Sequence, residues 1–141
     1  MKFRECNCVV NVLGHVHMDM LVRGVKGEVR LEKVLVDTGA TYTVLPLNVL
    51  EEVGAVKIPP YTISLELGDG RKVEAEVYAA AIKVGDRMGP ALILSFKNAK
   101  AALGVQALEA LGLRVNPATG RLESTRPKGI AYFYQQKSAL G

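Results

Sequence analysis

The sequence predicts a single, mostly β domain, and three observations support this. The chain has 141 residues, close to the ~150 residues of an average domain. Hydrophobic residues make up 49% of it and charged residues 23%, the composition of a globular protein rather than a disordered one. Short apolar runs alternate with polar residues, and Gly, Pro, Asn or Asp stand between the runs. No repeat or linker divides the chain, so we expect one domain over residues 1–141.

The first two runs predict a pair of antiparallel strands. The run from Val9 to Val22 is rich in Val, Met and Leu, and Gly14 within it predicts a bulge or turn. Residues 24–27 (Gly-Val-Lys-Gly) predict the connecting turn. The run from Glu28 to Val36 alternates at first and ends apolar, so this strand should enter the core just before Asp37.

The next segment predicts a short helix and then a change of direction. The run from Leu45 to Val53 suits a short helix, and Gly54 is a natural residue to end it. Pro59 and Pro60 would block any continuation, and we expect an extended segment to start there.

The strictest alternation in the chain predicts a β-hairpin. Its strands are expected over Tyr61 to Leu67 and Lys72 to Tyr78, with Gly68-Asp69-Gly70 as the turn, because these residues tolerate positive φ. Ala79 to Val84 and Ala91 to Phe96 predict two further strands.

The C-terminal third contains the one clear helix. Val105 to Leu111 has helical spacing, and Gly112 is a natural cap. Asn116 to Gly120 predicts a turn. Beyond it, Pro127-Lys128-Gly129 predicts another turn, and Ile130 to Tyr134 predicts a strand of high β-propensity.

Charge and hydropathy exclude several classes of function. Eighteen Lys and Arg against fourteen Asp and Glu give a net charge of +4, and the basic residues are scattered rather than clustered, so we expect no nucleic-acid partner. Cys6 to Met18, as long as any stretch of the chain without a charged residue, falls short of the ~20 apolar residues of a membrane span. The N-terminus also lacks the pattern of a signal peptide. These observations predict a soluble, cytoplasmic protein with no membrane partner.

The two cysteines and two histidines form short pairs that could suggest a metal site. Cys6 and Cys8 are separated by one residue, as are His15 and His17, whereas common zinc spacings are longer. We interpret them as half-buried strand residues, and we expect no metal and no cofactor.

The most informative stretch is the apolar run that ends in Asp37-Thr38-Gly39-Ala40. An ionised carboxylate delivered into the interior needs hydrogen-bond donors around it, and Gly39 lets backbone N–H groups approach while Thr38 adds a hydroxyl. A simple turn at the end of a strand would also explain the tripeptide. The apolar residues on both sides of it favour a functional carboxylate.

The chain resembles the retropepsin-like aspartic proteases in three motifs that occur in the family's order. These are Asp37-Thr38-Gly39-Ala40 after an apolar strand, the hairpin from Tyr61 to Tyr78, and Ala102-Leu103-Gly104 before the helix that starts at Val105. The resemblance runs from about Glu28 to Glu123. It implies a closed β-barrel of the acid-protease fold with one short C-terminal helix, which acts as a homodimer.

The resemblance also implies roles for individual residues. Asp37, Thr38 and Gly39 would be catalytic. Substrate-binding residues would be Leu35 and Ala102 in apolar pockets, Ala40, and Gly68, Asp69 and Gly70 at the tip of a flap that closes over a peptide. The hairpin could equally be a plain exposed one, and the apolar pair ordinary core. Two positions depart from the retroviral pattern: Thr41 replaces an Asp and Val105 replaces an Arg, so the pair that braces the retroviral dimer is missing.

The chemistry of the family needs two aspartates that share a proton. No second Asp-Thr-Gly or Asp-Ser-Gly is present, so a second chain would have to supply the other Asp37. The predicted function is therefore peptide-bond hydrolysis by a homodimer, acting on a peptide or protein. The alternative is a non-catalytic or weakly catalytic peptide-binding or dimerisation module of the same fold. An aspartyl-phosphate enzyme fits less well, because Gly39 stands where a second acid is expected.

The C-terminal extension, residues 121–141, admits three interpretations. The strand from Ile130 could lie on its own domain, at the two-fold interface in place of the missing brace, or in a neighbour's cleft. We favour the interface strand.

Overall fold

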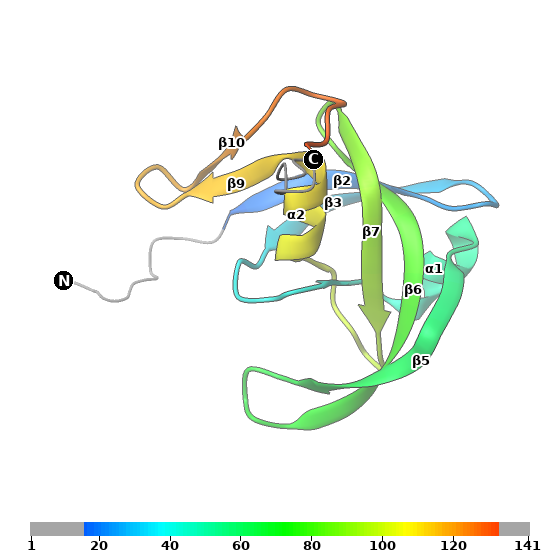
Figure 1. The fold of residues 1–141 in the computed structure, drawn as a ribbon. Helices are drawn as coiled ribbons and strands as arrows, with labels where there is room; N and C mark the ends of the chain where they lie inside the picture. Colours follow the sequence, from blue (N-terminus) through cyan, green and yellow to red (C-terminus); the bar gives the residue numbers. More distant parts are fainter. Residues whose placement is uncertain (1–15, 133–141) are drawn as a thin grey trace, which may run out of the picture.

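The computed structural model describes residues 16–132, and the chain is mostly β, with 52% strand and 12% helix (Figure 1). The elements follow one another in this order: β2 (His17–Arg23), β3 (Glu28–Val36), β4 (Thr43–Val44), α1 (Leu47–Val53), β5 (Val56–Glu66), β6 (Lys72–Val84), β7 (Arg87–Ser95), β8 (Ala102–Leu103), α2 (Val105–Leu111), β9 (Leu113–Asn116) and β10 (Arg121–Ser124). The predicted strand from Val9 is seen only in its second half, because residues 1–15 lie outside the described part.

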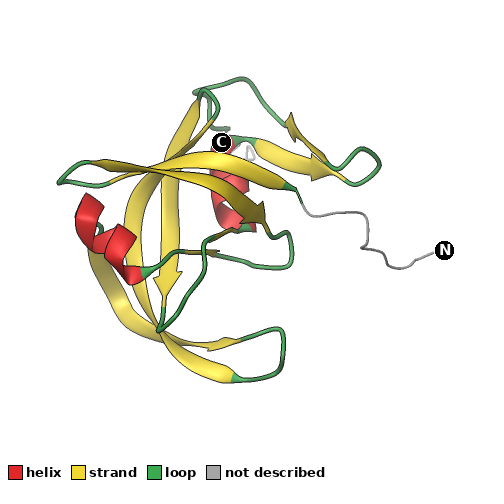
Figure 2. Ribbon diagram, turned by 180° about the vertical axis from the view of Figure 1, so that it is seen from behind, coloured by secondary structure: helices red, strands yellow, loops and turns green. Residues whose placement is uncertain are grey.

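Six of these strands close a barrel. Their order is β2-β3-β8-β4-β7-β6, and β2 pairs with β6 to complete the ring. Within residues 16–132, β5 pairs only with β6, so the β5–β6 hairpin extends from the barrel, as Figures 1 and 2 both show. The fold class predicted from the sequence is confirmed.

Apolar side chains from the strands, together with Leu45 just after β4, fill the barrel. Val22, Leu45, Ile82, Ile93 and Leu103 are all fully buried. Both helices add to the same cluster, through Val49, Leu50 and Val53 of α1 and Ala107, Leu108 and Leu111 of α2. This shared core holds the loops at the barrel's rim in place.

Glycines end both helices, as predicted. Gly54 and Gly112 each adopt φ 72° in the left-handed region, where an L side chain is disfavoured. α1 begins two residues later than expected, because Pro46 is its N-cap. Within residues 16–132, α2 is the one short C-terminal helix that the resemblance implied, and α1 is the short helix predicted before Gly54.

The edge of the sheet differs from the prediction in two ways. β5 begins at Val56, before the Pro59–Pro60 pair, which has a cis peptide bond and lies where the β5–β6 register shifts. Prolines are tolerated there because β5 is an edge strand and needs no donor on its open side. The strands expected over 72–78 and 79–84 are one continuous strand, β6, which pairs with β5 along one half and β2 along the other.

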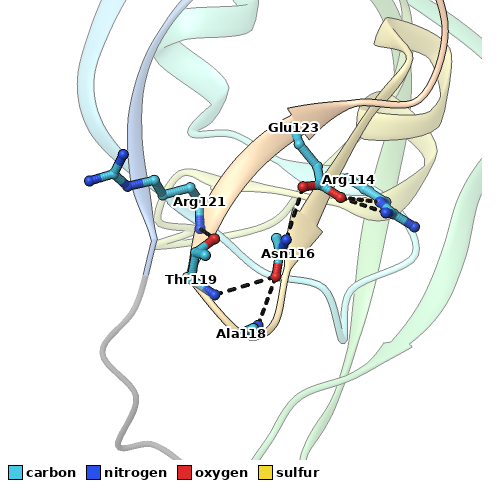
Figure 3. Close-up of polar contacts among 6 residues, drawn as sticks. All are labelled: Arg114, Asn116, Ala118, Thr119, Arg121 and Glu123. Atoms are coloured by element: carbon cyan, nitrogen blue, oxygen red, sulfur yellow. Dashed lines mark hydrogen bonds and ion pairs between the residues drawn. The ribbon is translucent and has the colours of Figure 1, made fainter.

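The predicted turn at Asn116 joins β9 to β10 in a separate two-stranded sheet (Figure 3). The Asn116 side chain accepts hydrogen bonds from the backbone N–H groups of Ala118 (2.8 Å) and Thr119 (3.3 Å), and it donates to Glu123 (2.9 Å). Arg114 donates to the same carboxylate at 2.6 Å. Both donors lower the pKa of the Glu123 carboxyl, and the hydrogen bond from Asn116 has the larger effect.

The C-terminal extension does not continue as predicted over its described part. Its first residues form β10, which pairs with β9 of the same chain. The turn at 127–129 is present, but residues 130–132 belong to no strand, and Ile130 and Tyr132 are exposed. High β-propensity produces a strand only where a ladder partner is available. Residues 133 and 134 of the expected strand lie outside the described part.

Candidate active site

Asp37 stands at the end of β3, in a tight loop at the rim of the barrel. The backbone N–H of Asp37 donates to the carbonyl oxygen of Leu103 at 2.8 Å, and its own carbonyl accepts from Ala40 at 3.1 Å. Its side-chain Oδ1 accepts from the N–H of Gly39 at 3.0 Å. The carboxylate is thus half-buried and held by a backbone donor, which is the role expected for Gly39.

The segment from Ala102 to Gly104 anchors this loop from beneath. β8 inserts between β3 and β4, with Ala102 opposite both Leu35 and Val44. Gly104 follows at once, and its N–H donates to the buried hydroxyl of Thr43 at 3.0 Å. A Cβ on Gly104 would lie 2.5 Å from the carbonyl group of Tyr42, so only glycine fits there.

Backbone hydrogen bonds connect the Asp37 loop to α2 at the two positions that lack the retroviral ion pair. The N–H of Val105 donates to the carbonyl of Ala40 at 2.8 Å, and the N–H of Gln106 donates to that of Thr41 at 2.9 Å. The loop is therefore held without charged side chains at 41 and 105.

A groove with a volume of ≈770 Å³ separates the Asp37 loop from the β5–β6 hairpin. Its apolar lining comes from the loop and from the inner faces of the strands: Tyr42, Val44, Ile63, Leu65, Leu67, Leu94 and Phe96. Its polar rim includes Glu66, Asn98 and Lys100. The groove is large enough for several residues of an extended peptide.

The groove brings together part of the predicted site. Asp37, Gly39, Ala40, Gly68 and Ala102 all line it. The other predicted residues, Leu35, Thr38, Asp69 and Gly70, are not among its lining residues.

The tip of the β5–β6 hairpin is ordered by its own side chains. Asp69 accepts from the backbone N–H of Arg71 at 2.9 Å and from its guanidinium at 2.7 Å. Both hydrogen bonds lower the pKa of the Asp69 carboxyl, and the bond from the backbone N–H of Arg71 has the larger effect. The turn therefore has a defined shape, while Asp69 itself remains exposed.

Sequence reasoning missed the strand residues that line the groove. Ile63 and Leu65 alternate with polar neighbours, and this alternation does mark them as one face of the hairpin. It does not indicate whether that face covers a core or a groove. Asn98 and Lys100 lie in the irregular segment between β7 and β8, where no sequence pattern distinguishes them.

No cluster of three or more His, Cys, Asp or Glu side chains suited to a metal occurs within residues 16–132. Of the two short pairs, only His17 belongs to that part of the chain. Nor does the part that the structure describes contain a helix long and apolar enough to span a membrane.

The barrel, the Asp-Thr-Gly loop and the facing hairpin define an acid-protease type of site. In agreement, the chain matches the aspartyl protease family over residues 21–107, which includes both the loop and the hairpin. The chain belongs to this family, whose general activity is that of a protease, a hydrolase. No curated protein matches the chain.

Proposed function

We propose that the chain is an aspartic endopeptidase that acts as a homodimer, with Asp37 of each copy forming the catalytic pair. The observation that carries the proposal is the Asp37 carboxylate, which an Asp-Thr-Gly loop presents to an open, largely apolar groove. One ionised carboxylate would take a proton from water, while the other, protonated, donates to the scissile carbonyl oxygen. Two such groups in contact share one proton because both cannot ionise.

The position of the loop supports a partner on one side of the barrel. In Figures 1 and 2, the loop after β3, the tip of the β5–β6 hairpin and the β9–β10 turn all project to the same side. A second copy on a two-fold axis at this side would bring its Asp37 next to the first.

Among the described residues, Glu66 is the second carboxylate that lines the groove, but it suits the acid–base role poorly. It is the last residue of β5 and is exposed on the hairpin. Its distance from the Asp37 loop would change whenever the hairpin moves, whereas a shared proton needs a fixed pair. We therefore assign the second carboxylate to a second copy.

The apolar lining supports a preference for hydrophobic side chains beside the cleaved bond. Tyr42, Ile63, Leu65 and Leu94 would contact them. The hairpin would close over the peptide as a flap and exclude water.

The decisive experiment compares Asp37→Asn with Asp86→Asn, a matched change in the exposed β6–β7 turn, on denatured protein. We expect Asp37→Asn to abolish cleavage with the melting temperature retained, and Asp86→Asn to keep it. When Asp37→Asn and wild-type chains are refolded together in equal amounts, only about one quarter of random dimers have both aspartates. Activity per wild-type chain should then fall by about half, whereas a monomeric enzyme would show no such loss.

A non-catalytic binding module of the same fold remains the alternative function. It predicts that wild-type protein cleaves nothing, yet binds apolar peptides as tightly as Asp37→Asn does. Fluorescence anisotropy with one labelled peptide separates the two functions.

A further inference from the structure

The hairpin that faces the groove has a second, polar face. Opposite residues of paired strands project to the same side of a sheet. Glu76 is opposite Ser95, and Glu74 is opposite Ser64, so these side chains share the face away from Ile63 and Leu65.

This outer face forms the floor of a second pocket with a volume of ≈600 Å³. We call it the rear pocket. Glu74, Glu76 and Ser95 line it from the sheet, and Leu47 lines it from α1. Phe96 and Asn98 line both the rear pocket and the groove, so the segment just after β7 borders both of them.

Ser95 gives the rear pocket an unmet hydrogen-bonding requirement. The residue is only 1% exposed, and its Oγ has no hydrogen-bond partner among residues 16–132. A buried hydroxyl without a partner is destabilising, so native proteins rarely keep one without a reason.

The two glutamates differ in how far they are already neutralised. Glu76 accepts from Lys57 at 3.1 Å and from the hydroxyl of Tyr78 at 2.8 Å. Glu74 accepts only from the Ser64 hydroxyl, at 3.1 Å, and forms no ion pair with any residue of the described part. Lys97, the one cation among the described residues that line the pocket, is exposed to solvent.

We propose that the rear pocket binds a lysine or arginine side chain of the polypeptide whose neighbouring residues occupy the groove. The cationic head would donate hydrogen bonds to Ser95 Oγ and to the Glu74 carboxylate. One group would thus give the buried hydroxyl a partner and Glu74 an opposite charge. The aliphatic stem would pack on Leu47 and Phe96. The proposal deepens the proposed function, because it names a charge preference at a distance from the cleaved bond.

The test measures binding rather than cleavage, so that it is independent of turnover. We would use a series of fluorescein-labelled peptides with an apolar centre, in which a single lysine occupies a different position in each peptide. Each has a matched control peptide with glutamine in place of that lysine. We expect Asp37→Asn protein to bind one lysine peptide about tenfold more tightly than its glutamine match. Adding Glu74→Gln should remove that difference, whereas Glu52→Gln, an exposed charge on α1 outside the pocket, should preserve it.

Ser95→Ala distinguishes a binding role from a structural one. Removal of the unsatisfied hydroxyl should raise the melting temperature by about 2–4 °C, yet lower the affinity for the lysine peptide several-fold. The proposal would be overturned if both Ser95→Ala and Glu74→Gln kept the preference for the lysine peptide. It would also be overturned if free N-acetyl-lysine amide displaced the labelled peptide as well as the unlabelled lysine peptide does. Lysine-dependent binding without cleavage by wild-type protein would leave this inference standing and refute the endopeptidase instead.

Discussion

The backbone N–H of Val105 donates a 2.8 Å hydrogen bond to the carbonyl oxygen of Ala40, which joins the first residue of α2 to the loop that holds Asp37. A backbone bond of this kind does not depend on which side chains stand at positions 41 and 105. The Asp37 loop can therefore keep its shape without the ion pair of the retroviral enzymes. Its geometry depends instead on how closely α2 approaches, and so on Gly104.

Gly104→Ala should disrupt the site through sterics alone. Its φ of −99° is ordinary, but a Cβ would meet the Tyr42 carbonyl at 2.5 Å and the Ala40 carbonyl oxygen at 2.9 Å. We expect a loss of about 2–3 kcal/mol in the free energy of unfolding, measured by urea denaturation, together with loss of cleavage. Gly68→Ala is the stability control, because a Cβ there has open space around it. Equal stability of the two variants would contradict this account.

Thr43→Val tests the buried hydroxyl under the loop. Thr43 is fully buried, and its Oγ1 accepts from the N–H of Gly104 at 3.0 Å. Valine has nearly the same shape but leaves that N–H without a partner, which costs about 1–3 kcal/mol. Thr43→Ser keeps the acceptor and should be the milder change in the same denaturation series. A valine variant as stable as the serine one would show that this hydrogen bond contributes little.

These two residues also show how far sequence reasoning reaches. Gly104 was predicted as part of a motif, whereas the reason for a glycine there, the approach of Tyr42, depends on strands brought together from distant parts of the chain. The alternation in β5 and β6 correctly predicted the hairpin, because periodicity reports which residues share a face. It cannot report what each face meets. The groove lining at Leu94 and the rear pocket at Ser95 are consequences of tertiary contact, so the sequence did not reveal them.

The pH dependence of stability should reveal the ion pair and hydrogen bond on Glu76. The Tyr78 hydroxyl, followed by Lys57, lowers the pKa of Glu76 from its ordinary 4.5. A lowered carboxyl pKa contributes stability above the ordinary value, and the contribution is lost as pH falls through the lowered one. Glu76→Gln should therefore melt below wild type at pH 7, with the difference shrinking as pH falls below about 4.5. A constant difference from pH 7 to pH 3 would contradict this.

Tyr78 should affect stability at the alkaline end of the same pH range. Burial, with the hydrogen bond to Glu76, raises the pKa of Tyr78 to about 12. A raised phenol pKa contributes stability below its ordinary value of 10, and this is lost as pH rises towards 12. The difference in melting temperature between Tyr78→Phe and wild type should therefore become smaller above pH 10. Melting curves in matched buffers provide the measurement.

Arg126→Ala should loosen the end of α2. The Arg126 guanidinium donates to the carbonyl oxygens of Glu109 and Ala110, each at 2.8 Å, and to that of Ile130. The last carbonyls of a helix have no partner within it, so a cation from outside stabilises them. We expect a loss of about 1–2 kcal/mol and faster amide exchange in α2. Arg121→Ala, an exposed arginine on β10, should change neither.

Deletion of residues 127–141 tests the three interpretations of the C-terminal extension. The described part of the deleted segment is exposed, with Ile130 at 47% and Tyr132 at 55%, while β10 and Arg126 remain. The described residues in the deletion therefore add little to the core, and we expect the barrel to stay folded by circular dichroism. If the extension forms the two-fold interface, the interpretation favoured from the sequence, light scattering will show a folded monomer without activity. A folded dimer with higher activity would instead indicate a segment that blocks the groove. An unfolded product would indicate a strand laid on its own domain.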